Sequence, residues 1–274
     1  MISKNQLKFH RQLELKKYRR QEGLFVAEGP KVVGDLLKAG FEVRQIYATP
    51  SWIADTCHHA KTQEVTEEEL RKLSFLQHPQ KVVAQFVMRE ATGDSRRDVT
   101  SGREVRQFPP ENVSLSAREY VTSPQQERHL LLALDGVQDP GNLGTIIRIA
   151  DWFGISTIYC SEDTADAWNP KVVQATMGSI ARVNIIYCSL EQLLQTAQVP
   201  VYGTLLDGHN IYEEELSAEG IIVMGNEGNG ISPRIRELVT HRLLIPQYHE
   251  GAESLNVAIA TAITCAEFRR RFRP

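Results

Sequence analysis

The segment Leu130-Leu-Leu-Ala-Leu-Asp135-Gly-Val-Gln-Asp-Pro-Gly-Asn142-Leu-Gly-Thr-Ile-Ile-Arg148 decides the fold class of this chain. Its apolar run ends in a turn rich in Asp, Pro and Gly. An amphipathic helix is predicted to start at about Asn142, a good N-cap residue. Open α/β sheets bind ligands at such turns, where strands end. Because the turn lacks both the Gly-x-Gly-x-x-Gly fingerprint and the Gly-Lys-Ser/Thr of a Walker loop, neither kind of nucleotide site is predicted.

From residue 129 onward, apolar runs alternate with helical segments. Strands separated by helices predict a parallel sheet with helices on both faces, and strands that are apolar throughout fit burial on both sides. Strands are expected at 130–135, 156–160, 183–187, 200–205, 220–225 and 242–246, and helices near 142–153, 170–180, 189–197, 232–239 and 254–271.

The first ninety residues predict a second, smaller α/β domain. Helices are expected at 3–18, 31–38 and 67–73, and strands at 25–27, 43–48 and 81–88. Residues 90–128 are rich in Ser, Thr, Pro and mixed charge, which predicts a linker or surface insertion. The predicted organisation is therefore a small domain at 1–89, a linker or insertion at 90–128 and a larger domain at 129–274.

The composition is that of an ordinary globular protein, with 42% hydrophobic and 24% charged residues. No apolar run approaches the roughly 18 residues that span a membrane, and the N-terminus does not resemble a signal peptide, so a cytoplasmic protein is expected. The four cysteines are widely separated and form no Cys-x-x-Cys pair. They are expected to be reduced thiols, and no metal site is expected, since Cys57-His58-His59 is most simply a surface sequence.

Positive charge gathers at the N-terminus although the net charge is −3. Residues 1–20 contain seven Lys and Arg against one acid, Glu14. Such a cluster either grips a polyanion or forms a solvated helix face. The candidates for gripping a polyanion are Lys8, Arg11, Lys16, Lys17, Arg19 and Arg20.

Two later segments join the first in a recognisable order. They are Ile222-Val-Met-Gly225-Asn-Glu227-Gly-Asn-Gly230-Ile-Ser232-Pro, and Leu244-Ile245-Pro followed after a polar loop by Ser254-Leu-Asn-Val-Ala-Ile-Ala260. Together the three resemble the motifs of the SpoU/TrmH family of RNA ribose 2′-O-methyltransferases, of the SPOUT class. The resemblance implies an α/β fold with a deep trefoil knot, a small N-terminal RNA-binding domain that contains the basic cluster, and a homodimer.

The resemblance also implies a donor, a substrate and a set of site residues. The methyl donor is S-adenosylmethionine, no metal takes part, and the substrate is RNA, with rRNA favoured over tRNA. Gly225, Ile245 and Leu255 are expected to bind the donor, and Thr204 and Leu205 to line its adenine pocket. The residues expected in catalysis are Asn142, Arg148, Glu227, Ser254 and Asn256.

For Arg148, the resemblance leaves two roles: activation of the ribose hydroxyl or binding of the neighbouring phosphate. A guanidinium is a poor base but a good bidentate clamp, and its charge can stabilise a developing alkoxide, so the phosphate role is predicted as primary. Without the motif, Arg148 is equally well interpreted as a helix-surface residue in an ion pair. The rival functions are a tRNA methyltransferase and a non-catalytic RNA-binding or ribosome assembly factor.

Overall fold

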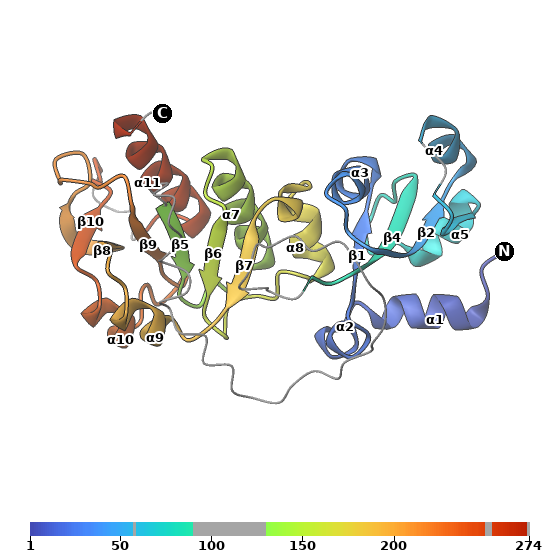
Figure 1. The fold of residues 1–274 in the computed structure, drawn as a ribbon, viewed down its shortest axis with the longest axis horizontal. Coiled ribbons are helices and arrows are strands. Elements are labelled where there is room, and N and C mark those ends of the chain that lie inside the picture. Colours follow the sequence, from blue (N-terminus) through green and yellow to red (C-terminus); the bar gives the residue numbers. More distant parts are fainter. Residues whose placement is uncertain (57–58, 90–129, 250–253, 273–274) are drawn as a thin grey trace, which may run out of the picture.

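The computed structural model describes residues 1–56, 59–89, 130–249 and 254–272, and these residues form two β-sheets that lie side by side (Figure 1). The predicted linker or insertion at 90–128 lies outside the described residues. The smaller sheet has the order β1-β4-β2-β3. Its strands are β1 (Leu24–Glu28), β2 (Val43–Ala48), β3 (Thr62–Glu64) and β4 (Val82–Val87).

Side chains alternate across the smaller sheet, so each of its faces packs on a separate core. Phe25 and Ala27 face the core that contains α3, whereas Leu24 and Val26 face the core that contains α5. The helices of this domain are α1 (Lys4–Gln12), α2 (Lys16–Glu22), α3 (Pro30–Lys38), α4 (Pro50–Asp55) and α5 (Glu67–Leu73).

One predicted helix of this domain is wrong. The segment 3–18 is not continuous, because α1 ends at Gln12 and α2 starts at Lys16 after an extended Leu15. Leu13, in the break, is fully buried between them. The two elements that sequence patterns missed are α4 and β3, both short.

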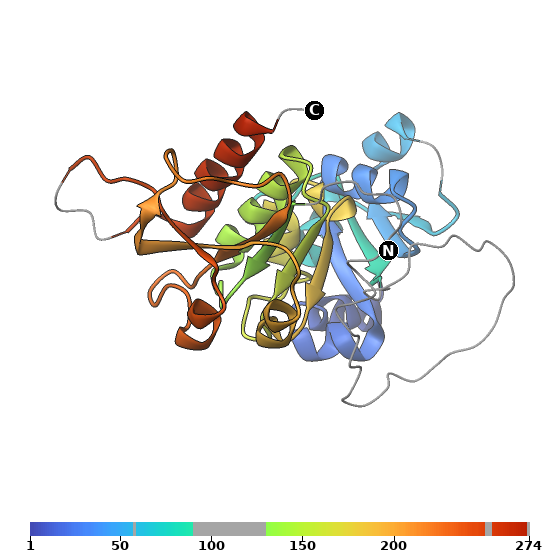
Figure 2. The same cartoon turned by 60° about the vertical axis from the view of Figure 1, so that its left-hand side comes forward.

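The larger sheet is parallel throughout, as predicted, with the order β10-β8-β9-β5-β6-β7. Leu132 and Leu134 pack toward α7 and α11, while Ala133 between them packs toward α9 and α10. Figure 2 shows these helix pairs on opposite faces of the sheet. The strands are β5 (Leu130–Leu134), β6 (Thr157–Cys160), β7 (Asn184–Tyr187), β8 (Val201–Asn210), β9 (Gly220–Met224) and β10 (His241–Leu244).

The structure corrects three predictions about the helices of the larger domain: two N-cap residues and the extent of one helix. The helix α7 (Pro140–Trp152) has Asp139, not Asn142, as its N-cap, and Asn256 rather than Ser254 caps α11 (Val257–Arg271). The predicted helix 170–180 divides into α8 (Pro170–Ala175) and a 3-10 turn at Ser179–Ala181. The remaining helices are α9 (Leu190–Gln195) and α10 (Pro233–Glu237).

The strand β8 continues beyond the predicted 200–205, but its pairing with β10 is interrupted. Arg242 pairs with Gly203, and the next residue, Leu243, pairs with His209. Residues 204–208 are therefore an excursion from the ladder, a device that re-aims side chains beside a site.

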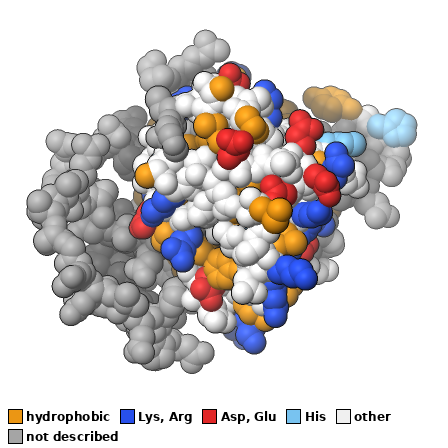
Figure 3. All heavy atoms as spheres, turned by 90° about the vertical axis from the view of Figure 1, so that its right-hand side faces the viewer, with side chains coloured by type: hydrophobic (Ala, Val, Ile, Leu, Met, Phe, Trp, Pro, Cys, Tyr) orange, Lys and Arg blue, Asp and Glu red, His pale blue; other side chains and the backbone are white. Residues whose placement is uncertain are grey.

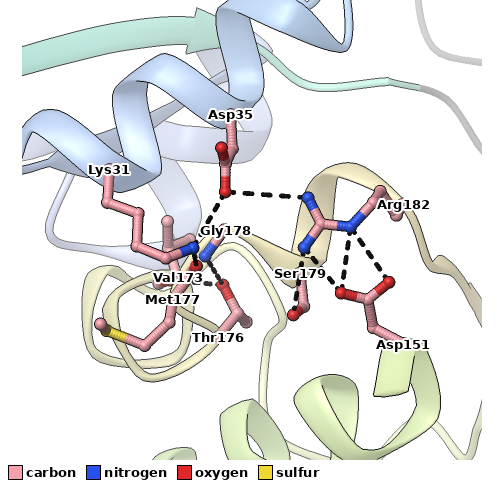
Figure 4. A network of polar contacts seen from close by, with 9 residues as sticks. All are labelled: Lys31, Asp35, Asp151, Val173, Thr176, Met177, Gly178, Ser179 and Arg182. Atoms are coloured by element: carbon pink, nitrogen blue, oxygen red, sulfur yellow. Dashed lines mark hydrogen bonds and ion pairs between the residues drawn. The ribbon is translucent and has the colours of Figure 1, made fainter. Parts of the chain in front are cut away.

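The two domains share a core. Phe25 of β1 lies 4.5 Å from Trp168 between ring centroids, and Val173 and Ile180 belong to the same buried cluster. A polar network continues the contact at the surface, where Arg182 bonds Asp151 of α7 and pairs with Asp35 of α3 (Figure 4). The described parts of the two domains therefore pack as one body.

Candidate active site

The three sequence motifs meet at the carboxyl ends of β5 and β9. These neighbouring strands are parallel, so the turn into α7 and the loop after β9 leave the same edge of the sheet. The start of α11 lies at this edge too, because Asn256 is hydrogen-bonded to Asn142. The fold thus brings Asn142 together with Glu227, which is 85 positions away in the sequence, and with Asn256, which is 114 positions away.

Asn142, Glu227 and Asn256 form a chain of side-chain hydrogen bonds. The Nδ2 of Asn142 donates to Oε1 of Glu227 over 3.0 Å, and the Nδ2 of Asn256 donates to Oδ1 of Asn142 over 2.9 Å. The Oδ1 of Asn256 accepts from the amides of Ala258 and Ile259 and so caps α11. A carboxylate only accepts hydrogen bonds, so Glu227 fixes the orientation of Asn142, which in turn fixes that of Asn256.

Glu227 also holds the turn before α7. Its carboxylate accepts from the amides of Gln138 and Asp139, each over 3.2 Å. Partial burial opposes ionisation, but the hydrogen bonds from Asn142, Gln138 and Asp139 outweigh it and lower the pKa of Glu227. The residue is therefore a carboxylate at neutral pH and serves as an acceptor in this network rather than as an acid.

The loop that contains Glu227 is folded back tightly. Asn226 and Gly230 bond each other through both backbone amides, and a Cβ on Gly225 would lie 2.2 Å from the carbonyl carbon of Gly230. The side chain of Asn226 donates to the carbonyl of Gly136 over 2.7 Å, which ties this loop to the turn after β5. Only glycine fits at position 225.

Sequence reasoning missed Asn226 and Asp139, which hold the two loops together. Asp139 accepts from the amide of Asn142 over 2.8 Å as the N-cap of α7. The sequence did carry its signal, since an Asp followed by Pro predicts an N-cap and first helical residue. Asn226 had no such local signal.

The residues expected to bind the donor surround the same edge. Gly225 follows β9 directly, and Thr204 begins the excursion of β8, where its hydroxyl donates to the carbonyl of Val223. Ile245 follows β10, and Leu255 precedes Asn256 and is 50% exposed. Leu205 and Ile245 are only partly buried, so apolar side chains remain available beside backbone that has left the ladder. Partly buried apolar side chains at this edge can pack against the rings of a ligand.

Arg148 is set apart from the hydrogen-bonded chain. It lies on α7 about 9 Å of helical rise beyond Asn142, on the exposed side of the helix with Gly141, Thr145 and Trp152. Among the described residues it has no hydrogen bond or ion pair, so the interpretation of this arginine as an ion-pair residue has no support in that part of the chain. Ser254 is exposed and does not cap α11, which removes the structural role predicted for it.

The basic cluster divides into exposed and buried members. Figure 3 shows Lys and Arg side chains along the lower part of the end of the molecule that carries α1 and α5. Lys8, Arg11, Lys16, Lys17 and Arg20 are exposed, and the guanidinium of Arg11 also lies over the Phe75 ring.

Arg19 is different, because it is only 1% exposed. Its guanidinium donates to the carbonyls of Leu13 and Glu14, at 2.9 and 2.6 Å, and to the carboxylate of Asp166 in the other domain. Arg19 therefore joins the domains and does not belong to the exposed surface predicted for it.

Neither a metal site nor a membrane span is found among the described residues. Within them, no group of three or more His, Cys, Asp or Glu is arranged to hold a metal ion. None of the helices described is long and apolar enough to cross a membrane.

Comparison with known families decides the identity of the fold. The family model described as the SpoU rRNA methylase family matches residues 129–266, and that described as the MRM3-like substrate binding domain matches residues 4–84. The chain belongs to the SpoU methylase family. The predicted SpoU/TrmH resemblance is thereby confirmed, together with the α/β architecture.

Relatives resemble the chain over its whole length. A 23S rRNA guanosine 2′-O-methyltransferase of Bacillus subtilis, RlmP, is 30% identical and is covered to 97%, as is this chain. A TrmH-family protein from Porphyromonas gingivalis is 40% identical with a TM-score of 0.79, covering 99% of both chains. An AdoMet-bound rRNA methyltransferase from Sinorhizobium meliloti is 30% identical with a TM-score of 0.79, covering 100% of this chain and 98% of that one.

Proposed function

We propose that this protein transfers the methyl group of S-adenosylmethionine to a ribose 2′-hydroxyl of RNA, with rRNA as the substrate class. The observation that carries the proposal is the hydrogen-bonded chain from Asn256 through Asn142 to Glu227, at the edge where the donor residues gather. The family supports the reaction, and the relatives named for 23S rRNA support rRNA over tRNA.

The donor supplies an electrophilic methyl group, so the protein must hold and orient the reacting groups. Gly225, Ile245 and Leu255 hold the donor, and Thr204 and Leu205 line its adenine pocket. Each amide of Asn142 and Asn256 has one Nδ2–H left after the bonds within the described site, because an amide nitrogen carries two hydrogens. Those N–H groups orient oxygen atoms of the target nucleotide, and Ser254 lines the same edge.

Arg148 acts on the substrate and not on the network. Its guanidinium clamps the phosphate beside the target ribose, and its charge stabilises the alkoxide that develops on the 2′-oxygen. The proton passes to a phosphate oxygen or to water, because arginine does not deprotonate in proteins.

A homodimer explains the exposed position of Arg148. Trp152, one helical turn further along α7, is 85% exposed, and Leu255 and Ile259 at the start of α11 are 50% and 54% exposed. Apolar side chains on two neighbouring helices form a surface that a second copy of the chain would cover. Arg148 would then lie at the interface, within reach of the substrate bound to the partner.

The remaining parts of the proposal concern organisation. Residues 1–89 form the RNA-binding domain and 129–274 the catalytic domain, supported by the two separate family matches. The catalytic domain contains a trefoil knot, a proposal that rests on family membership alone. We also propose that the protein is cytoplasmic, which its similarity to a bacterial rRNA methyltransferase supports.

Methyl transfer tests the proposal directly. The protein is incubated with donor labelled in the methyl group and with unmodified rRNA or tRNA, and the digested RNA is separated into nucleosides. We expect label in 2′-O-methyl nucleosides from rRNA, and none with Asn142→Ala, which breaks the chain of amides. Label on bases alone would contradict the proposal, and label in tRNA alone would reassign its substrate.

A further inference from the structure

A cavity of about 590 Å³ lies where the two domains meet. This volume falls in the range of roughly 300–1,000 Å³ that is typical of ligand pockets. Its walls come from α2, from the residues after β4, from the loop that follows β6 and from the end of β7. It is lined by Lys16, Arg19, Arg20, Gln21, Gly23, Met88, Arg89, Asp166, Trp168 and Tyr187.

The lining of the cavity is strongly positive. Lys16, Arg19, Arg20 and Arg89 face one carboxylate, Asp166, which already binds Arg19. Within the described residues, Lys16 and Arg20 have no hydrogen bond or ion pair. The Nε of Arg19 is buried and likewise has no partner in that part of the chain. A buried donor without a partner is costly, and an anion in the cavity would satisfy it.

Aromatic side chains give the cavity a rigid wall. Trp168 is half-buried and is held from behind by Phe25, 4.5 Å away between ring centroids. The hydroxyl of Tyr187 donates to the carbonyl of Ala165 and accepts from the amide of Ala167 over 2.8 Å, which fixes its ring. Pre-oriented rings beside guanidinium groups are the arrangement on which unpaired bases stack.

The cavity opens on the same edge of the sheet as the active site. Asp166 and Trp168 follow β6, and Tyr187 ends β7, whereas Asn142 follows β5. All three strands are parallel, so their carboxyl ends share that edge. From β5 to β7 is two inter-strand steps, or about 10 Å. The cavity extends from β7 toward α2, so a nucleotide in it would lie within a short stretch of RNA from one bound at Asn142.

We propose that this cavity binds an unpaired nucleotide of the RNA substrate, close in sequence to the methylated one. The phosphate lies between Lys16 and Arg20, and the base stacks on Trp168. The inference rests on the proposed RNA methyltransferase function and adds to it a requirement that the target lie in a single-stranded segment.

Binding of short RNA tests the cavity independently of methyl transfer. A fluorescent single-stranded RNA of eight nucleotides is titrated with the full chain by anisotropy, and a duplex of equal length serves for comparison. We expect the double variant Lys16→Gln, Arg20→Gln to bind the single strand about tenfold more weakly. Its salt slope should fall by about 0.7 for each phosphate that the variant no longer neutralises. The double variant Lys38→Gln, Arg44→Gln is the matched control, since it removes the same number of positive charges from exposed positions that neither line the cavity nor belong to the N-terminal basic cluster.

The stacking interaction is tested by removing either the base or the Trp168 ring. An oligonucleotide with one abasic position, moved along the strand, should lose affinity for the wild type at one position only. Trp168→Leu should cause a similar loss with the intact strand and no further loss with that abasic strand, because both changes remove the same stacking interaction. The cationic variants keep the test valid if Trp168→Leu does not fold.

The outcomes separate the cavity from the function. Unchanged affinity of Lys16→Gln, Arg20→Gln, or an equal loss in the Lys38→Gln, Arg44→Gln control, overturns the nucleotide site and leaves methyl transfer intact. Guanosine monophosphate that binds as tightly as the oligonucleotide would make the occupant a free nucleotide and also overturn the proposal. A wild type that binds the single strand but methylates no RNA would show that the proposed function fails.

Discussion

Replacing Arg19 by methionine should destabilise the protein by removing a buried cation that joins its domains. The change leaves the carbonyls of Leu13 and Glu14 without their guanidinium donor and leaves the Asp166 carboxylate unpaired. Loss of one partner from a buried ion pair costs about 3–5 kcal/mol. The Asp166 side chain is 15% exposed and can regain some hydration, so we expect the low end, about 3 kcal/mol.

The assay is urea unfolding at equilibrium, followed by circular dichroism and tryptophan fluorescence. Arg20→Met is the matched control, because Arg20 is the next residue and is exposed, and its effect should stay within about 0.5 kcal/mol. A double-mutant cycle with Asp166→Asn isolates the pair, since two residues in contact should not have additive effects. An Arg19→Met protein as stable as the Arg20→Met control would refute the reasoning.

Three further results are expected from the active site and its proposed interface. Arg148→Ala should raise the barrier to methyl transfer by about 2.7–4 kcal/mol and change donor affinity little. Arg148→Lys should also be slow, because an ammonium lacks the planar fork of a guanidinium. Near-normal turnover of the lysine variant under saturating donor would contradict the role of Arg148 as a phosphate clamp. If Arg148 acts on the partner's substrate, an equal mixture of Arg148→Ala and Glu227→Gln protomers should recover up to about a quarter of wild-type activity. Half of the dimers are then mixed, and one of the two sites in each mixed dimer is intact. A mixture as inactive as its components would place Arg148 in the site of its own protomer. Ile259→Glu should yield monomers by light scattering, while Tyr212→Glu, at another exposed hydrophobic position, stays dimeric. A dimeric Ile259→Glu protein would locate the interface elsewhere.

Local sequence patterns predicted the parallel sheet because its central strands β5, β6 and β9 are buried on both faces. Such burial requires a continuous apolar run, and Leu130 to Leu134 is one example. The strand β3 was missed because Thr62-Gln63-Glu64 lies at the edge of its sheet and buries nothing apolar. The start of α7 was placed two residues late because Asn142 resembles an N-cap, although Asp139-Pro140 is the stronger signal.

Local sequence patterns could not predict the contacts between residues that are far apart in the sequence. Asn142 meets Glu227 and Asn256 only because the parallel sheet and the loops bring three segments to one edge, and only the family resemblance grouped these residues in advance. The burial of Arg19 was not predictable either. A run of basic residues indicates charge but not which member faces inward, and its partner Asp166 lies 147 positions away.

The shared core around Phe25 and Trp168 also changes what the connection between the domains has to do. In a protein whose domains touch only through a tether, the length of the tether sets how far apart they work. Here packed side chains and the Arg19–Asp166 pair set that spacing. The stretch between the two sheets can therefore gain or lose residues without moving the exposed basic cluster relative to the edge that holds Asn142 and Glu227. Because packing sets the spacing between the domains, the length of the connecting segment is not constrained by that spacing.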